Sequence, residues 1–317
     1  MKKILIFKTD KIGDLINISS ILKNLNDNID NCEITLICSE YNHTVAKYYN
    51  FLHKIVIYKK IFPFFLITNF KIFFFKKYDL ILQLDGKKRS YLCSIFIRAK
   101  KKAAVRFLKK IKIFNFSFIS KRPSFLVSLF FDYLEDCVED YSVENNVSYH
   151  YLNLYLNILK FYKFKITSIN HHIPFKACQN KHFDTYTLIH IDERWSFFSN
   201  RFLFNFEKKI QSLSISNNII ITCNYQSNDY FNKLLTKIIN NNKVILISKT
   251  EVKDLINLIY YSSTVISSHT GLIVHIAACF KKKIIDIVSP DIFNELDRWI
   301  PNNSNYTRYK LDDFDNL

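Results

Sequence analysis

The sequence predicts an α/β protein of two doubly wound domains in tandem, facing each other across a cleft. Three observations lead to this class. Short apolar runs alternate with helical patterns in both halves of the chain, a polar stretch separates the halves, and the composition is that of a globular protein. Hydrophobic residues make up 49% of the 317 residues and charged residues 23%, a balance that excludes a disordered chain.

The N-terminal half contains four predicted strands. They lie at residues 3–7, 33–38, 54–58 and 79–84, where apolar residues run together. Leucine and isoleucine recur at spacings of three and four between residues 15 and 25, which predicts a helix after the first strand. A helical or amphipathic stretch is expected at 64–76 and a helix at 147–161, whereas 122–146 is less regular. Strands that alternate with helices form a parallel sheet with helices on both faces.

The C-terminal half repeats this alternation more regularly. Strands are predicted at 186–191, 218–223, 243–247, 264–267 and 283–288, and helices at 202–213, 231–238, 252–259 and 271–280. Polar residues dominate 167–184, which predicts a linker there. The predicted domains are therefore residues 1–166 and 185–317. Ligands in such sheets bind at the carboxyl ends of the strands.

The net charge of +17 and a pI near 9.4 indicate an anionic partner. Charge alone leaves open whether that partner is a nucleic acid, an anionic membrane or a phosphorylated ligand. No nucleic-acid-binding motif is present, so we expect no nucleic acid partner. The seven cysteines are scattered, with no C-x-x-C pair and no zinc-type spacing, and this is typical of reduced thiols in the cytoplasm.

The most apolar stretch, residues 61–75, is too short to span a bilayer and is interrupted by Pro63, Asn69 and Lys71. Its phenylalanines and the lysines around them favour a contact of residues 59–77 with an anionic membrane surface. The alternative is that most of these phenylalanines pack in a core or an acceptor pocket. The first apolar run of the chain is broken at Lys8, so it is assigned to a strand and not to a signal peptide.

Glycine is unusually rare, with 3 residues where about 7% is typical. In such a chain, glycine should remain mainly where a positive φ or a close backbone approach excludes other residues. Gly13 and Gly271 each follow a predicted strand and precede a predicted helix, and Gly86 follows the strand at 79–84. All three are therefore candidate site positions.

The loop after the first strand ends in Gly13 and Asp14, where Gly13 is expected to permit a tight turn and Asp14 to open the helix. One interpretation of Asp14 is a carboxylate stabilised by the helix dipole, worth about 0.3–1 kcal/mol. The other is a general base that faces the cleft.

Two further loops carry candidate phosphate contacts. Backbone N–H groups at the helix start after residues 267–270 suit a diphosphate, although Thr270 could simply cap the helix. Arg194 follows the strand at 186–191 and could grip a phosphate with its guanidinium fork. The alternative there is a core Trp195 beside a surface Arg194. His275 on the next helix is expected to pack or to face solvent.

Several enzyme classes are disfavoured because their motifs are missing. The sequence has no G-x-G-x-x-G, which argues against a nicotinamide or flavin dehydrogenase, and no G-x-x-x-x-G-K-[ST], which excludes a P-loop NTPase. It has no G-x-S-x-G of the α/β-hydrolases. No D-x-D follows a predicted strand, so a sugar transferase that depends on such a metal site is disfavoured.

Taken together, these segments resemble glycosyltransferase family 9, the heptosyltransferase family of lipopolysaccharide core synthesis. The family opens with a strand, a loop ending in Gly-Asp and a helix, and residues 8–14, KTDKIGD, occupy this place. Residues 79–90, DLILQLDGKKRS, match the family pattern D-L-x-x-x-L-x-G-x-x-R-S. In the second domain, ERW at 193–195 and HTGLIVHIAA at 269–278 stand where the family has K-x-W and D-T-G-x-x-H-x-A-A.

The resemblance implies a GT-B fold and an inverting transfer that uses no metal ion and no cofactor. It implies a nucleotide-sugar donor, a lipid-linked saccharide acceptor such as a lipopolysaccharide core, and a cytoplasmic enzyme peripheral to the inner membrane. The implied residues are Asp14 as catalytic base, donor contacts from Glu193, Arg194, His269, Thr270, Gly271 and Leu272, and acceptor-side contacts from Thr9, Lys11, Gly13 and Arg89.

Two positions depart from the family pattern. Glu193 stands where the family has lysine, and His269, a possible cation, stands where it has aspartate. Both lie where the resemblance places donor contacts. Three interpretations therefore remain: a heptose donor, a different nucleotide sugar used in capsule or other glycan assembly, and a degenerate homologue that binds nucleotide or lipid without transfer.

Overall fold

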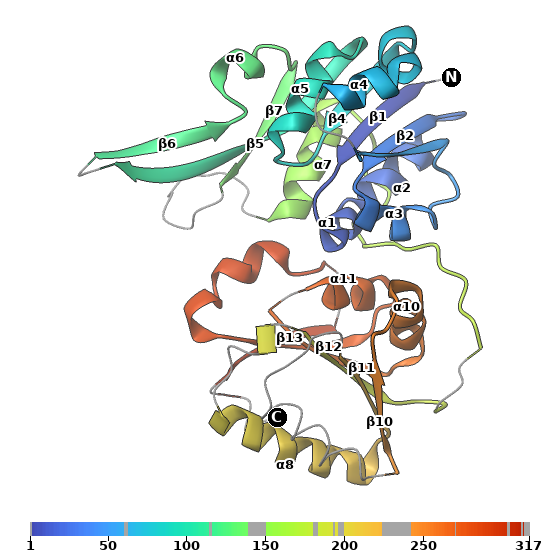
Figure 1. Cartoon of the computed structure of the whole chain (residues 1–317), viewed down its shortest axis with the longest axis vertical. Coiled ribbons are helices and arrows are strands. Elements are labelled where there is room, and N and C mark those ends of the chain that lie inside the picture. Colours follow the sequence, from blue (N-terminus) through green and yellow to red (C-terminus); the bar gives the residue numbers. More distant parts are fainter. Residues whose placement is uncertain are drawn as a thin grey trace. The chain divides into compact units, whose positions relative to one another are not determined.

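The chain divides into two compact units, Met1–Pro174 and Phe175–Leu317 (Figure 1). The computed structural model describes residues 2–59, 63–113, 116–138, 150–179, 183–192, 194–195, 200–223, 242–269, 271–302, 305–311 and 313. Within the predicted linker, the Thr167 N–H donates to Asn24 Oδ1 (2.6 Å) in the first unit, and the Cys178 N–H donates to Asn257 Oδ1 (2.9 Å) in the second. The linker at 167–184 stays a prediction.

The first unit contains a seven-stranded sheet in the order β3-β2-β1-β4-β5-β6, with β7 paired to β5. Its strands are β1 (Lys3–Lys8), β2 (Glu33–Cys38), β3 (Lys54–Ile57), β4 (Tyr78–Gln83), β5 (Ala99–Ile113), β6 (Phe116–Arg122) and β7 (Tyr133–Val138). All pairs are parallel except β5 with β6. The central strands are buried on both faces, which explains why they are continuous apolar runs.

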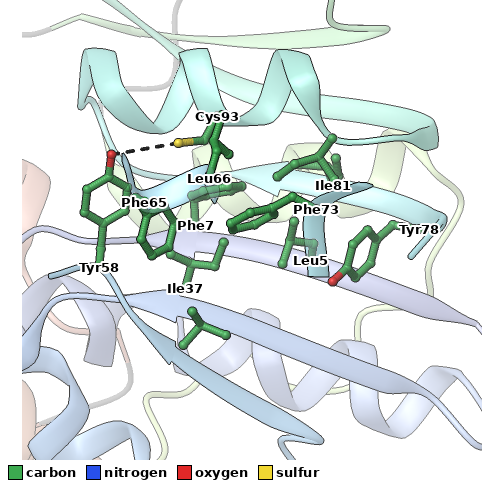
Figure 2. Close-up of a cluster of buried hydrophobic side chains, with 12 residues drawn as sticks. Leu5, Phe7, Ile37, Tyr58, Phe65, Leu66, Phe73, Tyr78, Ile81 and Cys93 are labelled. Atoms are coloured by element: carbon green, nitrogen blue, oxygen red, sulfur yellow. Dashed lines mark hydrogen bonds between the residues drawn. The ribbon is translucent and has the colours of Figure 1, made fainter. Parts of the chain in front are cut away.

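Helices cover this sheet: α1 (Ile12–Asn17), α2 (Ser19–Asn28), α3 (Glu40–Ala46), α4 (Phe64–Thr68), the π-helical turn η1 (Lys71–Phe75), α5 (Lys88–Phe96), α6 (Phe125–Ser128) and α7 (Tyr151–Phe161). The helix predicted after β1 is broken at Ile18, between α1 and α2. Phe65 of α4 and Phe73 of η1 pack onto β1, β2, β3, β4 and α5 in one buried cluster (Figure 2). The helical stretch predicted at 64–76 is therefore confirmed.

The second unit contains a six-stranded parallel sheet in the order β10-β9-β8-β11-β12-β13. Its strands are β8 (Thr187–Ile191), β9 (Ile219–Cys223), β10 (Val244–Ser248), β11 (Thr264–Ser268), β12 (Lys283–Val288) and β13 (Asn305–Lys310). Its helices include α8 (Asn200–Ser216), α10 (Val252–Tyr261) and α11 (Leu272–Cys279), with 3₁₀ turns η3 (Pro290–Ile292) and η4 (Glu295–Trp299). The helix predicted at 231–238 lies outside the described residues. The doubly wound class is confirmed for both units.

Each sheet has one point at which the strand order reverses. In the first unit this point lies between β1 and β4, and in the second between β8 and β11. At such a point the loops that follow the two adjacent strands run in opposite directions. The carboxyl ends of these two strands then border the crevice in which open α/β sheets bind ligands. The residues concerned are 9–11 and 84–87 in the first unit and, among the described residues, 192, 194–195, 269 and 271 in the second.

Candidate active site

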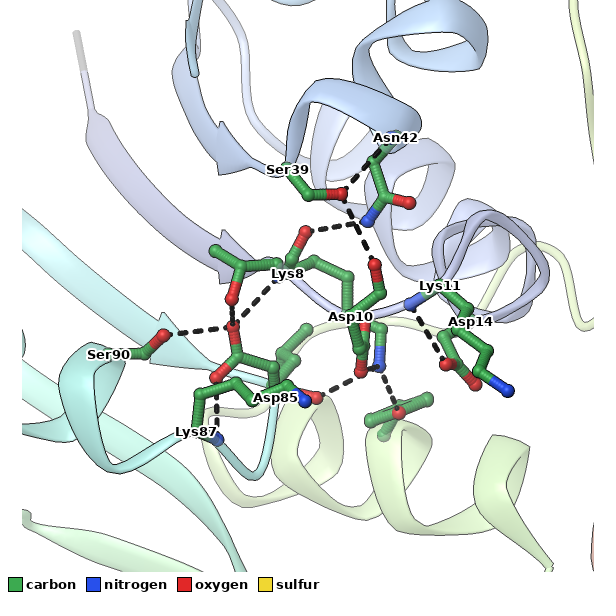
Figure 3. Close-up of polar contacts among 12 residues, drawn as sticks. Lys8, Asp10, Lys11, Asp14, Ser39, Asn42, Asp85, Lys87 and Ser90 are labelled. Carbon is green, nitrogen blue, oxygen red and sulfur yellow. Dashed lines mark hydrogen bonds and ion pairs between the residues drawn. The ribbon is translucent and has the colours of Figure 1, made fainter. Parts of the chain in front are cut away.

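A buried carboxylate joins the two loops at the reversal point of the first sheet. Asp85, which follows β4, is fully buried and accepts five hydrogen bonds (Figure 3). Two come from Thr9 after β1, from the backbone N–H (2.8 Å) and the hydroxyl (2.7 Å). Ser90, Gln83 and the Lys87 N–H supply the others. Thr9 is thus buried, and its side chain holds the two loops together.

Lys8, the last residue of β1, is also buried and donates hydrogen bonds in three directions. Its Nζ lies 2.8 Å from Asp10 Oδ2, 2.9 Å from the Tyr155 hydroxyl and 3.1 Å from the Leu84 carbonyl oxygen. Burial alone would lower the pKa of Lys8, but Asp10, Tyr155 and Asp14 together raise this pKa well above its ordinary value. Lys8 is therefore a fixed cation next to the loop 9–11, which leads into α1 and Asp14.

Asp10 has an unusual environment for a carboxylate. Burial raises the pKa of Asp10 to about 7, assisted by the nearby carboxylates of Asp14 and Asp85 and opposed by Lys8. Its Oδ2 accepts from Lys8, whereas its Oδ1 has no hydrogen-bond partner in the described part of the chain. Lys8, Asp10 and Tyr155 were not predicted as site residues from the sequence. The sequence feature that could have indicated Lys8 and Asp10 is a lysine and an aspartate two residues apart at the end of a buried strand.

Asp14 lies at the third position of α1, is half-buried, and accepts a hydrogen bond from the Lys11 N–H (3.3 Å). Asp14 therefore lies at the start of a helix, as the first interpretation expected. Its carboxylate is also partly exposed, so it can still act as a base, and that role stays a prediction. Lys11 itself is exposed. The tight turn expected at Gly13 is wrong, because Gly13 lies within α1 and none of the described glycines has a positive φ.

Arg89 lies in the first turn of α5, directly after the loop that carries Asp85 and Gly86. It is exposed, and its guanidinium carbon lies 4.5 Å from the centroid of the Tyr58 ring. A Cβ atom at Gly86 would lie 3.0 Å from the Phe107 ring, so a close approach accounts for this glycine. The four residues predicted on the acceptor side, Thr9, Lys11, Gly13 and Arg89, all follow β1 or β4.

In the second unit, Arg194 bridges the loops at the reversal point between β8 and β11. Its Nε donates to Asp192 Oδ2 (2.9 Å), its Nη2 donates to the same oxygen, and its Nη1 donates to the His269 carbonyl oxygen (2.9 Å). A Cβ atom at Gly271 would lie 2.1 Å from Nη2 of Arg194. The close approach expected at Gly271 is therefore confirmed, and its cause is the guanidinium.

Three of the five guanidinium N–H groups of Arg194 are used by Asp192 and His269. Among the described residues no acceptor takes the second N–H of either Nη nitrogen, so these two N–H groups remain for another acceptor. Arg194 is partly exposed, with 27% of its side-chain surface accessible, so it is not the plain surface residue of the alternative interpretation. It lies beside Gly271, immediately before α11 begins at Leu272.

Trp195 belongs to the core, which agrees with one of the two interpretations of this loop. It is 1% exposed, its indole N–H donates to the His190 carbonyl oxygen (3.0 Å), and its ring centroid lies 4.9 Å from that of Phe206. This anchoring fixes the backbone next to Arg194. Glu193 and Thr270, both predicted donor contacts, lie outside the described residues.

His269 is buried and adopts a left-handed conformation with φ of 54°. Its Nδ1 contacts the Ser268 hydroxyl, and its Nε2 accepts a hydrogen bond from the Ser289 N–H (3.1 Å). An accepting Nε2 requires the neutral ring. Burial, together with Arg194, also lowers the pKa of His269, against the opposing effect of Asp286. The expectation of a possible cation at this position is therefore wrong: the ring is a neutral part of the loop structure.

His275 is buried in α11, which matches the expectation of a packed histidine. A separate cavity of about 450 Å³ lies at the carboxyl end of the edge strand β10 and is lined in part by Cys178, Ser248 and Lys253. None of the predicted site residues lines it. It is also away from the reversal point of its sheet, so we assign the candidate site to the loops around Arg194.

No family model and no curated protein sequence matches the chain. Solved structures do. A glycosyltransferase of family 9 from Veillonella parvula matches with a TM-score of 0.68 and 14% identity, over 98% of this chain and 86% of its own. The chain has the fold of family 9 glycosyltransferases.

Two Escherichia coli structures support this assignment of the fold. Heptosyltransferase WaaC with ADP-2-deoxy-2-fluoro heptose matches with a TM-score of 0.67 and 13% identity, over 97% of this chain and 92% of its own. ADP-heptose lipopolysaccharide heptosyltransferase II matches with a TM-score of 0.66 and 10% identity, over 98% and 91%. A UDP-GlcNAc 2-epimerase from Methanocaldococcus jannaschii is more distant, with a TM-score of 0.54. The resemblance to family 9 is confirmed for the fold, which is GT-B.

Proposed function

We propose that this protein is an inverting glycosyltransferase that moves a sugar from a nucleoside-diphosphate sugar to a lipid-linked saccharide without a metal ion. One observation carries the proposal. In a chain with the fold of family 9, the two groups of predicted residues follow the strands at the reversal points of the two sheets, where such sheets bind ligands. The epimerase match shows that fold alone does not select a reaction.

The donor is assigned to the second unit. Arg194 is held by Asp192 and His269, so its guanidinium is already oriented, and two of its N–H groups remain for phosphate oxygens. The start of α11 at Leu272 lies next to it and adds backbone N–H groups and the positive end of a helix dipole. WaaC, which shares the fold, has been solved with ADP and with an ADP-heptose analogue.

The acceptor is assigned to the first unit, with Asp14 as general base. In the proposed step, the Asp14 carboxylate takes the proton of an acceptor hydroxyl while that oxygen bonds to the anomeric carbon of the donor. The bond from that carbon to the diphosphate breaks on the opposite face, which inverts the configuration. The leaving diphosphate gains negative charge, and the guanidinium and helix start stabilise that charge because they are in place beforehand.

The identity of the sugar is a finer question. The neutral His269 and the acidic Glu193 replace the aspartate and lysine of the family pattern, which favours a donor other than ADP-heptose. A heptose donor and a degenerate homologue remain the alternatives. A thermal-shift screen of ADP-, UDP-, GDP- and CMP-linked sugars separates a heptose donor from other donors, because a ligand at 100 times its Kd stabilises the protein by about 2.7 kcal/mol. A degenerate homologue that still binds nucleotide would respond in this screen but would not transfer the sugar.

Replacing Arg194 with alanine is expected to weaken binding of the nucleoside diphosphate product about 10- to 100-fold. The reason is the loss of charge-assisted hydrogen bonds worth about 1.5–3 kcal/mol. Calorimetric titration with ADP, UDP and GDP measures this loss. Arg194→Lys keeps the positive charge but loses the planar guanidinium, so its Kd should lie between those of the wild type and Arg194→Ala. Lys253→Ala changes an exposed residue of the same unit and should bind the nucleoside diphosphate normally. An unchanged Kd in Arg194→Ala would show that Arg194 does not bind the diphosphate.

Transfer is expected to continue in the presence of EDTA. The positive charge that the diphosphate needs is assigned to Arg194 and the start of α11, and the described part of the chain contains no group of three or more His, Cys, Asp or Glu arranged for a metal ion. The measurement is sugar transfer with and without EDTA, followed by addition of Mg²⁺. Loss of transfer with EDTA and recovery with Mg²⁺ would show that a metal ion does this work instead.

A further inference from the structure

The positive charge of the chain is concentrated in one stretch of the first unit. Residues 41–131 contain 20 of the 45 Lys and Arg residues but 2 of the 28 Asp and Glu residues, a net charge of +18. The rest of the chain contains 25 basic and 26 acidic residues, a net charge of −1. The overall charge of +17 is therefore a property of this stretch and not of the surface in general.

Part of this stretch folds into helices on one face of the first sheet, and much of the rest forms the strands β5 and β6. Phe65 and Phe73, from α4 and η1, share a buried cluster with Cys93 of α5. Tyr91 of α5 packs in turn with Phe131, which follows α6. The helices α4, α5 and α6 therefore form a continuous row, which Figure 1 shows along the upper edge of the first unit. We call the outer side of this row, with the strand β6 beside it, the α4–α6 surface.

The α4–α6 surface exposes large apolar side chains at both of its ends. The exposed residues on α4 and η1 are Phe64, Ile67, Phe70, Phe74 and Phe75, and those on and after α6 are Phe125, Leu126, Leu129 and Phe130. Phe75 and Phe125 are 77% and 76% exposed. Phe65, Leu66 and Phe73 point into the core instead (Figure 2), so core packing accounts for only part of the apolar stretch. Phe62 lies outside the described residues.

Exposed basic residues accompany these apolar groups on and after η1, after α5 and at the end of β6. Lys71, Lys77, Arg98, Lys121 and Arg122 are all exposed, and none forms an ion pair with another residue that the structure describes. Their neighbours differ, because Lys76 pairs with Glu33 (3.0 Å) and Lys100 with Asp79 (2.7 Å). The surface thus combines uncompensated positive charge with unburied phenylalanine and leucine.

We propose that the α4–α6 surface docks on an anionic lipid bilayer. Phenylalanine and leucine can enter the boundary between headgroups and acyl chains while lysines and arginines meet anionic headgroups. Among the described helices, none is long and apolar enough to cross a bilayer. The apolar ends favour lipid over a nucleic acid, because a phosphate backbone in water gains from the charges and not from exposed Leu126 or Ile67. The inference extends beyond the proposed reaction, since docking and transfer can succeed or fail separately.

The test is co-sedimentation of the full chain with phosphatidylcholine vesicles, with and without phosphatidylglycerol, in low-salt buffer. We expect binding to the mixed vesicles and little to phosphatidylcholine alone. Lys71→Glu/Lys77→Glu/Lys121→Glu should weaken binding to mixed vesicles at least about tenfold, since each charge near the surface contributes to partition. Phe125→Ser/Leu126→Ser/Leu129→Ser should also weaken it, and the binding that remains should be lost in about 1 M NaCl, where charges are screened beyond about 3 Å.

Matched controls keep the result specific. Lys165→Glu/Lys176→Glu/Lys253→Glu reverses three exposed lysines outside residues 41–131, and Ile215→Ser removes an apolar side chain that is 77% exposed in the second unit. Both variants should bind as the wild type does, and so should Asp14→Asn, which is expected to lower turnover and not membrane binding. The proposal fails if the wild type ignores mixed vesicles at low salt, or if the controls weaken binding equally. It also fails if the α6 serine variant binds vesicles normally while random oligonucleotides compete, because the surface then recognises polyanions.

Discussion

Asp14→Asn is expected to lower the turnover of sugar transfer by about 10²–10⁴ while leaving the fold and product binding unchanged, because it removes the proposed general base. Asparagine keeps an oxygen that can accept the Lys11 N–H, which Asp14 accepts at 3.3 Å, so the start of α1 should be preserved. The measurements are initial rates at saturating donor and acceptor, urea unfolding, and calorimetric titration of the nucleoside diphosphate.

The helix-start interpretation of Asp14 makes a different prediction. A carboxylate that only stabilises the helix dipole is worth about 0.3–1 kcal/mol, so its loss would appear in urea unfolding and hardly in turnover. Near-normal turnover in Asp14→Asn would therefore refute the base role. Asp30→Asn, an exposed change in the same unit, is the matched control. Asp10→Asn is the competing candidate, because the raised pKa of Asp10 suits a base, although its Oδ2 is already bonded to Lys8.

The sequence predicted the strands well where burial on both faces makes them continuous apolar runs. β2 and β12 lie at their predicted bounds, and β8 begins one residue late. The sequence did not predict β5 and β6. β5 reads AKKKAAVRFLKKIKI, and its lysines interrupt the apolar pattern because, where burial is described, only residues 103–105, 107 and 108 in its middle are buried. A strand whose ends lie at the surface does not show the pattern of a buried strand.

The sequence predicted which loops form the candidate site, but not the hydrogen bonds that join their residues. Glycine rarity pointed to Gly86 and Gly271, and close approaches by Phe107 and Arg194 give the physical reason for both. The partners of Lys8 could not be read from the sequence, since Tyr155 lies 147 positions away in the chain. The charge of His269 was misjudged for a similar reason, because the N–H that fixes its neutral ring belongs to Ser289, 20 positions further on.

Lys8→Met is expected to reduce the free energy of unfolding by about 3–5 kcal/mol, because it leaves the largely buried Asp10 carboxylate, which is 19% exposed, without its cation. The Tyr155 hydroxyl and the Leu84 carbonyl oxygen would also lose a donor. The loss should depend on pH. The folded-state pKa of Asp10 is raised above its unfolded value, so ionising Asp10 destabilises the folded protein as pH rises from about 4 to about 7.

Removing Lys8 takes away the charge that lowers this pKa, so the variant should lose most stability at about pH 8 and least at about pH 5, where Asp10 is protonated. Urea unfolding at both pH values measures the difference. Lys8→Met/Asp10→Asn is the matched control, because an uncharged pair carries no such penalty and its stability should change little between the two pH values. Equal losses at both pH values in Lys8→Met would instead mean that Lys8 contributes packing and not charge next to the loop that leads into α1.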